Sequence, residues 1–160
     1  MDSTTIDFLN WLLAISSAMM AGVYLAFSSF IMRAFAALGP ARAIAAMNAV
    51  NTVILKSAFM ALFFGSCAVA LLMVATGLWS WSTPGAGRAV ASGAIYLVGM
   101  FGVTALANVP LNNALAAVSG DSEAAVRTWD DYLRRWTRWN TLRTVASVLT
   151  AALCIGLPGL

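Results

Sequence analysis

The chain has 160 residues, of which 61% are hydrophobic and only 9% charged, and its formal net charge is +3. A soluble domain typically carries about 25% charged residues, so this composition excludes an ordinary water-soluble globular protein. The mean hydropathy is +0.85, and several uncharged runs exceed the roughly 20 residues that cross hydrocarbon as a helix. These features predict an integral membrane protein.

The first uncharged run predicts a membrane span over residues 8–32. Ala18, Gly22 and Ala26 share one face of this helix and form a ridge of small residues, which allows another helix to approach closely. The ridge suits either an interface within the subunit or one between two subunits, so the sequence allows both a monomer and a homo-oligomer. Tyr24 lies on a neighbouring face.

Gly39-Pro40 separates this span from a mildly amphipathic helical segment over residues 41–55, in which Asn48 and Asn51 supply much of the polarity. The segment either lies at the membrane interface or extends the next helix. That next span is predicted over residues 57–79, and a short loop rich in Gly, Pro and Ser follows it.

The third span is predicted over residues 89–108 and runs into the sequence Asn108-Val109-Pro110-Leu111-Asn112. Proline cannot donate a backbone hydrogen bond, and the residue before it avoids the α region, which predicts a kink or break at Val109. The two amides are four residues apart and share a helical face. Buried amides are costly unless paired, so they indicate a packing joint or a binding site.

A polar helical segment over residues 122–138 leads into the fourth predicted span, residues 139–158. Within the polar segment, Asp130 with Arg134 and Asp131 with Arg135 have the spacing of helical ion pairs and indicate a hydrated face. The predicted fold is all-α, an integral membrane four-helix bundle that forms a single domain over residues 1–160.

The distribution of basic residues predicts the orientation in the membrane. Arg88 alone lies in the loop between the second and third spans, whereas the other eight of the nine basic residues lie in the two remaining loops and the adjoining helix ends. By the positive-inside rule, the polar loops are cytoplasmic and both termini extracytoplasmic, in the inner (plasma) membrane of a bacterium. The eight residues are Arg33, Arg42, Lys56, Arg127, Arg134, Arg135, Arg138 and Arg143.

Several kinds of site are excluded or disfavoured. The chain has no histidine, which excludes a Ser/His/Asp triad, a bis-histidine haem and an ordinary histidine zinc site. No predicted span contains an acidic residue, which argues against a proton-coupled exporter. No Gly-rich phosphate loop with a lysine occurs, and basic residues confined to the membrane edges argue against nucleic acid as a partner. Cys67 and Cys154 are predicted to be free buried thiols, and no metal site is predicted.

Polar side chains from three regions are predicted to converge at one depth. Trp136, Asn140, Arg143 and Ser147 recur at helical spacing and form one stripe. We expect this stripe to approach the motif asparagines of the third span and the amides at the start of the second. Amides and a guanidinium can hold phenolic or carbonyl oxygens, and tryptophan faces accept a flat ring. The alternative is structural, with asparagines joining helices, tryptophans forming interface belts and arginines reaching headgroups.

The asparagine–proline motif, followed by Trp129-x-x-Tyr132-x-x-x-Trp136-x-x-Trp139-Asn140-x-x-Arg143-Thr144, resembles the anthrone oxygenase-like family of small four-helix membrane proteins. The resemblance extends across nearly the whole chain. It implies oxidation of a polyketide-type anthrone to an anthraquinone by molecular oxygen, with no organic cofactor or metal. Many relatives carry histidine directly after the motif asparagine, whereas this chain has Thr141.

This chemistry needs an oxyanion stabiliser, a proton acceptor and a dry cavity. Arg143, Asn140, Asn108 and Asn112 are the candidates for holding the oxyanion and neighbouring phenols. Asp130, Tyr132 or water could accept the proton. The substrate-binding candidates are Trp136, Trp139, Tyr132, Asn48, Asn51 and Tyr24.

The predicted partners are the lipid bilayer, a lipophilic aromatic molecule and molecular oxygen. Whether the protein is an enzyme stays open at this point. The second interpretation is a non-catalytic membrane protein that binds a lipid or quinone, or whose motif only fixes helix packing. A transporter is third, because no acidic residue lies within a predicted span.

Overall fold

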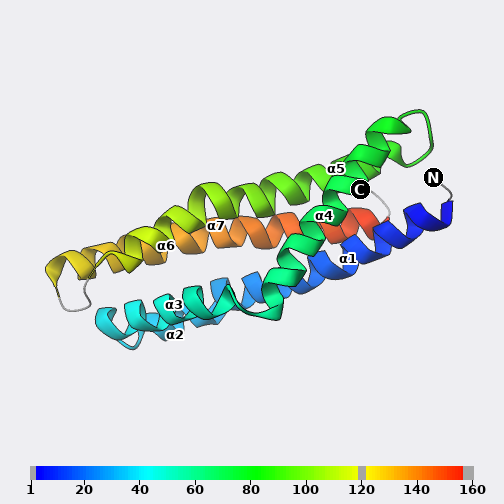
Figure 1. The fold of residues 1–160 in the computed structure, drawn as a ribbon. Helices are drawn as coiled ribbons and strands as arrows, with labels where there is room; N and C mark the ends of the chain where they lie inside the picture. Colours follow the sequence, from blue (N-terminus) through cyan, green and yellow to red (C-terminus); the bar gives the residue numbers. More distant parts are fainter. Residues whose placement is uncertain (1–2, 119–121, 157–160) are drawn as a thin grey trace.

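The computed structural model describes residues 3–118 and 122–156, which form helices joined by short turns and contain no strand. The elements in chain order are α1 Ser3–Ala26, η1 Phe27–Ile31, α2 Met32–Ala36, α3 Pro40–Ile54, α4 Ala58–Trp79, α5 Ala86–Tyr96, η2 Leu97–Gly102, η3 Thr104–Asn108, α6 Val109–Ala116 and α7 Glu123–Ile155 (Figure 1). The three η elements are π-helical turns within longer helices, each wider than an α-helical turn.

Among the described residues, three helices are long and apolar enough to cross a membrane, which indicates a membrane protein. They are Ile6–Ala36, Ala58–Trp79 and Ala86–Ala116. The first and third have 31 residues each, or about 46 Å at 1.5 Å per residue. Because a bilayer core is only about 30 Å thick, these two helices are long enough to extend beyond it.

Helix α7 lies alongside α1 and α5 for much of its 33 residues (Figure 1). It contains most of the fourth predicted span, although residues 157–158 lie outside the described residues. It is less apolar than the three helices above, because its first half carries charged residues such as Asp131 and Arg135 and its second half contains Asn140 and Arg143. The first turn of α1 and the last turn of α7 lie at the same end of the molecule.

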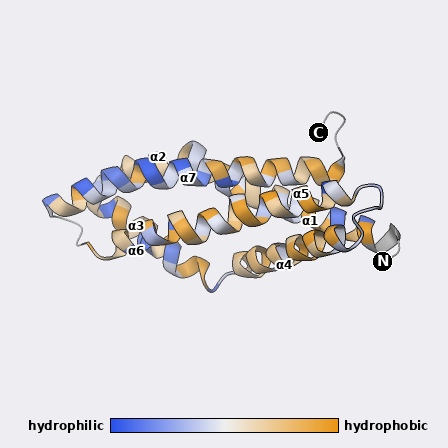
Figure 2. Cartoon of the chain, turned by 90° about the horizontal axis from the view of Figure 1, so that it is seen from above, coloured by the Kyte–Doolittle hydropathy of each residue, from blue (hydrophilic) through white to orange (hydrophobic). Residues whose placement is uncertain are grey.

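Two clusters of buried hydrophobic residues lie at different heights along the molecule. One joins α1, α4 and α5 through residues such as Leu13, Met73 and Tyr96. The other joins α2, α3, α6 and the first half of α7, at the end where Figure 2 shows more hydrophilic residues. Cys67 and Cys154 are free and buried, which confirms that prediction.

Trp129 and Trp136 belong to the second cluster and do not form the lipid-facing interface belt that the structural alternative describes. Both are at most 5% exposed. Their rings stack on either side of Tyr132, with centroids 5.8 and 6.0 Å from the tyrosine ring. Burial of such a ladder binds α7 to α3 and α6 by dispersion and the hydrophobic effect.

Glycines allow close packing of α5 and η2. A Cβ atom on Gly93 would lie 2.5 Å from the carbonyl oxygen of Ala70, and one on Gly99 would lie 2.5 Å from Cβ of Ala146. The ridge on α1 is not used in this way. At Gly22 no described atom lies within 4 Å of an added Cβ, so the ridge faces outward.

The predicted kink or break at Val109 is not a break, because the helix continues through this residue. Val109 has helical angles, φ −62° and ψ −46°, and α6 begins there. The π-helical turn η3 precedes Pro110, and a wider turn accommodates both the missing N–H and the bulk of the proline ring. Helix α3, by contrast, is separate from α4. Ser57 caps the new helix by accepting a hydrogen bond from the backbone N–H of Phe59 at 3.3 Å.

The charged face of α7 differs from the prediction in one pair. Asp131 pairs with Arg135 at 3.1 Å, as predicted, and also with Arg134 at 3.2 Å. The predicted pair of Asp130 with Arg134 is therefore wrong. These pairs are solvent-exposed and contribute little to stability.

Candidate functional site

A cavity of about 340 Å³ lies between the two hydrophobic clusters, where α1, α3, α4, η3 and α7 approach one another. Ligand sites typically measure about 300–1,000 Å³ and combine apolar walls with a few polar groups. Most of the lining is apolar and aromatic, including Phe27, Phe59 and Phe63. The polar lining residues are Tyr24, Asn51, Thr104, Asn108, Asn112, Asn140 and Arg143, together with the indole of Trp136.

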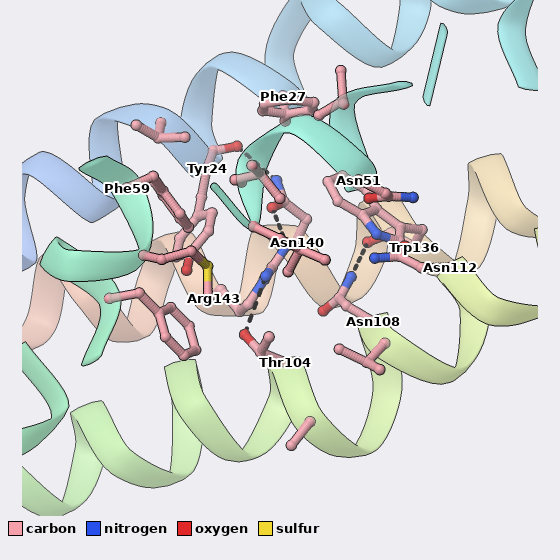
Figure 3. A pocket seen from close by; sticks show the side chains of 18 of the residues that line it. Tyr24, Phe27, Asn51, Phe59, Thr104, Asn108, Asn112, Trp136, Asn140 and Arg143 are labelled. Carbon is pink, nitrogen blue, oxygen red and sulfur yellow. Dashed lines mark hydrogen bonds between the residues drawn. The ribbon is translucent and has the colours of Figure 1, made fainter. Parts of the chain in front are cut away.

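Arg143 places a buried guanidinium at this cavity (Figure 3). The residue is 6% exposed. Its Nη1 donates to Thr104 Oγ1 at 3.1 Å, and its Nη2 donates to Asn140 Oδ1 at 2.7 Å. The guanidinium carbon lies 4.2 Å from the Tyr24 ring centroid and 5.3 Å from the Trp136 ring.

No acidic residue within 3–118 and 122–156 forms an ion pair with Arg143. A buried charge is stabilised only by pairing and hydrogen bonds, and here the hydrogen-bonding partners are neutral. The cavity therefore favours an anion, or an oxygen that becomes anionic during a reaction.

Asn140 orients this guanidinium and joins α7 to α1. It is fully buried, and its Nδ2 donates to the Tyr24 carbonyl oxygen and to Ser28 Oγ, both at 2.6 Å. With both N–H groups used in this way, Oδ1 points to Arg143 (Figure 3).

A second polar group forms where η3 and α6 meet α7. Asn108 is 1% exposed, and its Nδ2 donates to the Trp136 carbonyl oxygen at 3.3 Å. Tyr132 Oη donates to Asn112 Oδ1 at 2.8 Å. Tyr132 itself does not line the cavity. Burial raises the pKa of its phenol above the ordinary value, so at neutral pH it is a hydrogen-bond donor and not a base.

Besides Tyr132, other residues considered from the sequence also lie away from the cavity. Trp139 is 40% exposed on the outside of α7, and Asn48 is absent from the lining. Asp130 is exposed and cannot act as an internal base. Thr141 is also exposed, with Oγ1 2.9 Å from the Thr137 carbonyl oxygen and 3.1 Å from Ser28 Oγ. Trp139, Asp130 and Thr141 lie on exposed faces of α7, which periodicity alone did not distinguish from the face toward the cavity.

Thr104 and the aromatic wall were not predicted from the sequence. Thr104 precedes Asn108 by four residues, as Asn108 precedes Asn112, so helical spacing could have added it to the motif. Phe59 and Phe63 belong to a long apolar run that carries no such signal.

Three π-helical turns border the cavity. Phe27 begins η1, Phe101 lies in η2, and η3 contains both Thr104 and Asn108. Such turns are frequent at functional sites because they redirect side chains and loosen the regular backbone hydrogen bonds.

The donor set suits an organic oxygen more than a metal. No group of three His, Cys, Asp or Glu side chains that could hold a metal occurs in the part of the chain that the structure describes. The cavity instead presents amides, hydroxyls and a guanidinium, which bind phenolic, carbonyl and anionic oxygens.

Comparison with known proteins adds a family. The family model described as anthrone oxygenase matches residues 47–153, which is more than half of the chain and confirms the resemblance found from the motifs. The matched region includes all the polar lining residues except Tyr24. No match was found among curated proteins or among solved structures. The chain belongs to the anthrone oxygenase family.

Proposed function

We propose that this protein oxidises a flat, phenolic, anthrone-type substrate with molecular oxygen, in the cavity beside Arg143. The observation that carries the proposal is the buried guanidinium, which has neutral hydrogen-bonding partners and aromatic neighbours in an otherwise apolar cavity. Family membership supports the reaction class.

The proposed reaction converts the methylene carbon of the anthrone into a carbonyl. That carbon loses two hydrogens and gains one oxygen atom, while the second atom of O₂ leaves as water. Loss of the first proton spreads negative charge onto the existing ketone oxygen, and the resulting carbanion reacts with oxygen. Arg143 is the candidate for stabilising that oxyanion, since a preorganised donor in a dry cavity acts strongly on developing charge.

The remaining residues have distinct proposed roles. Asn140 is a positioning residue, because its hydrogen bonds hold the guanidinium in place. Trp136, Phe27 and Phe59 form walls that accept a flat ring. We assign proton removal to water, because the two side chains considered as bases, Asp130 and Tyr132, lie outside the lining. The reaction as proposed requires neither an organic cofactor nor a metal.

A direct assay tests the proposal. Purified protein in detergent is mixed with an anthrone in air, and quinone absorbance and oxygen uptake are followed with metal analysis of the same sample. We expect both signals to exceed the protein-free background in equal molar amounts. Saturable binding with a background oxidation rate would instead support the second candidate, a lipid- or quinone-binding protein. A stoichiometric metal would refute the metal-free mechanism.

We also propose that four helices cross the membrane, α7 being the fourth, with the polar loops cytoplasmic and both termini outside, in a bacterial inner membrane. Arg143 is removed from the count of loop charges because it is buried. The seven remaining basic residues of that group are exposed, and they still outnumber Arg88 in the other loop. The shared end of α1 and α7 supports this arrangement.

Cysteine labelling tests the orientation. Ser82 lies in the loop between α4 and α5, whereas Ala45 lies on α3, in the segment that joins the first two proposed spans, and both residues are exposed. A membrane-impermeant maleimide should label Ser82→Cys in intact spheroplasts, and Ala45→Cys only after permeabilisation. The parent protein controls for the buried native cysteines. The reverse pattern would refute the orientation.

A further inference from the structure

The cavity beside Arg143 reaches the surface of the protein through a mouth that is bordered by apolar side chains. Every polar residue of the lining is buried or half-buried. The lining residues that are exposed, and that therefore border the opening, are all apolar or aromatic. They are Val23, Leu55, Phe64, Phe101, Ala105 and Val109. Leu55 is 66% exposed, Phe64 57% and Val109 43%.

The mouth lies between α4 and the continuous helix that runs from η2 to α6. A turn over residues 55–57 separates α3 from α4 and changes the direction of the chain (Figure 1). Beyond this turn α4 packs against α1 and α5, whereas α3 packs against α6 and α7. Leu55 and Phe64 border the mouth on the α4 side. Phe101, Ala105 and Val109 recur every four residues and form the opposite edge.

Packed side chains close the cavity toward both ends of the molecule. At the hydrophilic end, the stacked rings of Trp129, Tyr132 and Trp136 belong to a cluster whose members are at most 9% exposed. At the other end, Tyr96 and Met100 are fully buried in the first cluster. Protein interiors packed in this way contain few voids larger than a water molecule. The opening therefore lies on the side of the helix bundle.

The side of the bundle at this height faces hydrocarbon. Phe64 lies on one of the three helices that are long and apolar enough to cross a membrane, and Phe101, Ala105 and Val109 lie on another. An apolar border of this kind is unfavourable in water and favourable in contact with acyl chains. Lys56 is exposed beside Leu55, and a long basic side chain there can reach the headgroups. One edge of the mouth thus approaches the headgroup layer.

From this geometry we infer that the cavity exchanges its ligands laterally with the bilayer, through the mouth between α4 and the helix η2–α6, and not with the aqueous phase. The molecules that pass are apolar and aromatic compounds dissolved in the membrane. For the identity of the ligand the inference rests on the proposed function, whereas the opening itself does not. Molecular oxygen is apolar and can enter by the same route, while the guanidinium stays shielded from bulk water.

Spin-label accessibility in liposomes tests the opening without any ligand. A nitroxide is attached to Ala105→Cys, and its collisions with O₂, which concentrates in hydrocarbon, are compared with those of a water-soluble nickel chelate. The first reference is Leu106→Cys, whose parent side chain is 83% exposed and outside the lining. The second is Arg127→Cys, at the site of a solvent-exposed ion pair. The parent protein controls for labelling of the buried native cysteines.

We expect the ratio of oxygen to nickel collisions at Ala105→Cys to match that at Leu106→Cys and to exceed that at Arg127→Cys several-fold. Phe64→Cys, on the opposite edge of the mouth, should give the same result if Ala105→Cys does not fold. Nickel collisions as frequent as at Arg127→Cys would show a water-filled mouth and overturn the inference. Rare collisions with both reagents would show a closed mouth and would also overturn it.

Binding kinetics test passage through the mouth. Stopped-flow quenching of tryptophan fluorescence by anthraquinone would be measured in liposomes. Ala105→Phe should slow association and dissociation together by about tenfold, because passing an added ring imposes a barrier of the size that overpacking usually costs. Phe64→Ala should accelerate both rates. Leu106→Phe is the matched control and should retain the parent rates. Parent rates in Ala105→Phe, or weaker binding with an unchanged association rate, would reject passage at this edge.

These results are separable from the oxidation assay. Access from lipid alone, found together with a background rate of anthrone oxidation, would retain the lateral opening and reject the proposed reaction. Oxidation above background with free access of the nickel chelate to the mouth would retain the reaction and reject lateral entry. Absence of saturable quenching by anthraquinone would reject the proposed ligand class, and the spin-label measurement would still decide the opening.

Discussion

Replacing Arg143 with leucine should lower the rate of anthrone oxidation by about 100- to 1,000-fold. Removal of one preorganised donor to an oxyanion typically costs this much, or about 3–4 kcal/mol of transition-state stabilisation. Here the donor is also the cation that lies against the cavity. Quinone formation under air, with protein quantified after size-exclusion chromatography, measures the effect.

Arg138→Leu is the matched control, because Arg138 is an exposed arginine on the same helix. It should retain the parent rate. Arg143→Lys should recover part of the activity, since an ammonium supplies charge without the two-pronged geometry that contacts Thr104 and Asn140. A parent-like rate in well-folded Arg143→Leu would reject the role of Arg143.

Replacing Arg143 should also change the pH dependence of the oxidation rate. The reactive form of the substrate is its anion, and a nearby cation lowers the pKa of the group that forms it. The rate of the parent protein should therefore rise with pH and level off at a lower pH than that of Arg143→Lys or Arg143→Leu, where the stabilising charge is displaced or absent. Identical profiles would show that Arg143 does not stabilise the anion.

The largest effect on stability is expected at Gly93. An alanine Cβ there would lie 2.5 Å from the Ala70 carbonyl oxygen and 2.7 Å from Cγ2 of Val74. A contact this short is a steric clash with the backbone of α4, and it can be relieved only if α4 and α5 move apart. Gly93→Ala should therefore destabilise the protein by about 1–3 kcal/mol, as overpacking usually does. Thermal unfolding in detergent measures the change.

Gly65→Ala on α4 is the control for this substitution. No described atom lies within 4 Å of a Cβ at Gly65, and alanine favours a helix over glycine by up to about 1 kcal/mol. This variant should match or exceed the parent in stability. A Gly93→Ala protein as stable as Gly65→Ala would show that the α4–α5 contact is looser than the structure describes.

Several features of the site follow directly from sequence spacing. Asn140 and Arg143 are one helical turn apart and Trp136 is one turn before them, so a single stripe on α7 had to face one direction. Asn108 and Asn112 are placed together by the same rule. Spacing did not distinguish Trp139 from Trp136, because a tryptophan suits a lipid-facing surface as well as a cavity wall.

The helix through Pro110 shows a limit of predicting backbone structure from local sequence rules. A proline in a long apolar helix predicts disruption, and the local rule for Val109 predicts the wrong backbone angles. Packing of η3 and α6 against α7 keeps the chain helical, and the π-helical turn provides the extra space. The backbone energy of one residue is small compared with the contacts that a continuous helix retains.

By itself, the sequence determined that this is an all-helical membrane protein, because uncharged runs of this length leave few other ways to pair backbone hydrogen bonds. It also determined the family and the helical stripes that carry the polar groups. Only the tertiary structure decided that Arg143 is buried beside Thr104 and Tyr24. It also decided that the Asn140 amide donates a hydrogen bond to the backbone of α1, and that Asn108 Oδ1 has no hydrogen-bond partner among the described residues. The physical reason is that periodicity specifies which side chains share a face of one helix. The rotation of each helix about its axis depends on packing between residues far apart in the chain, and that packing determines which polar atoms are paired and which remain free.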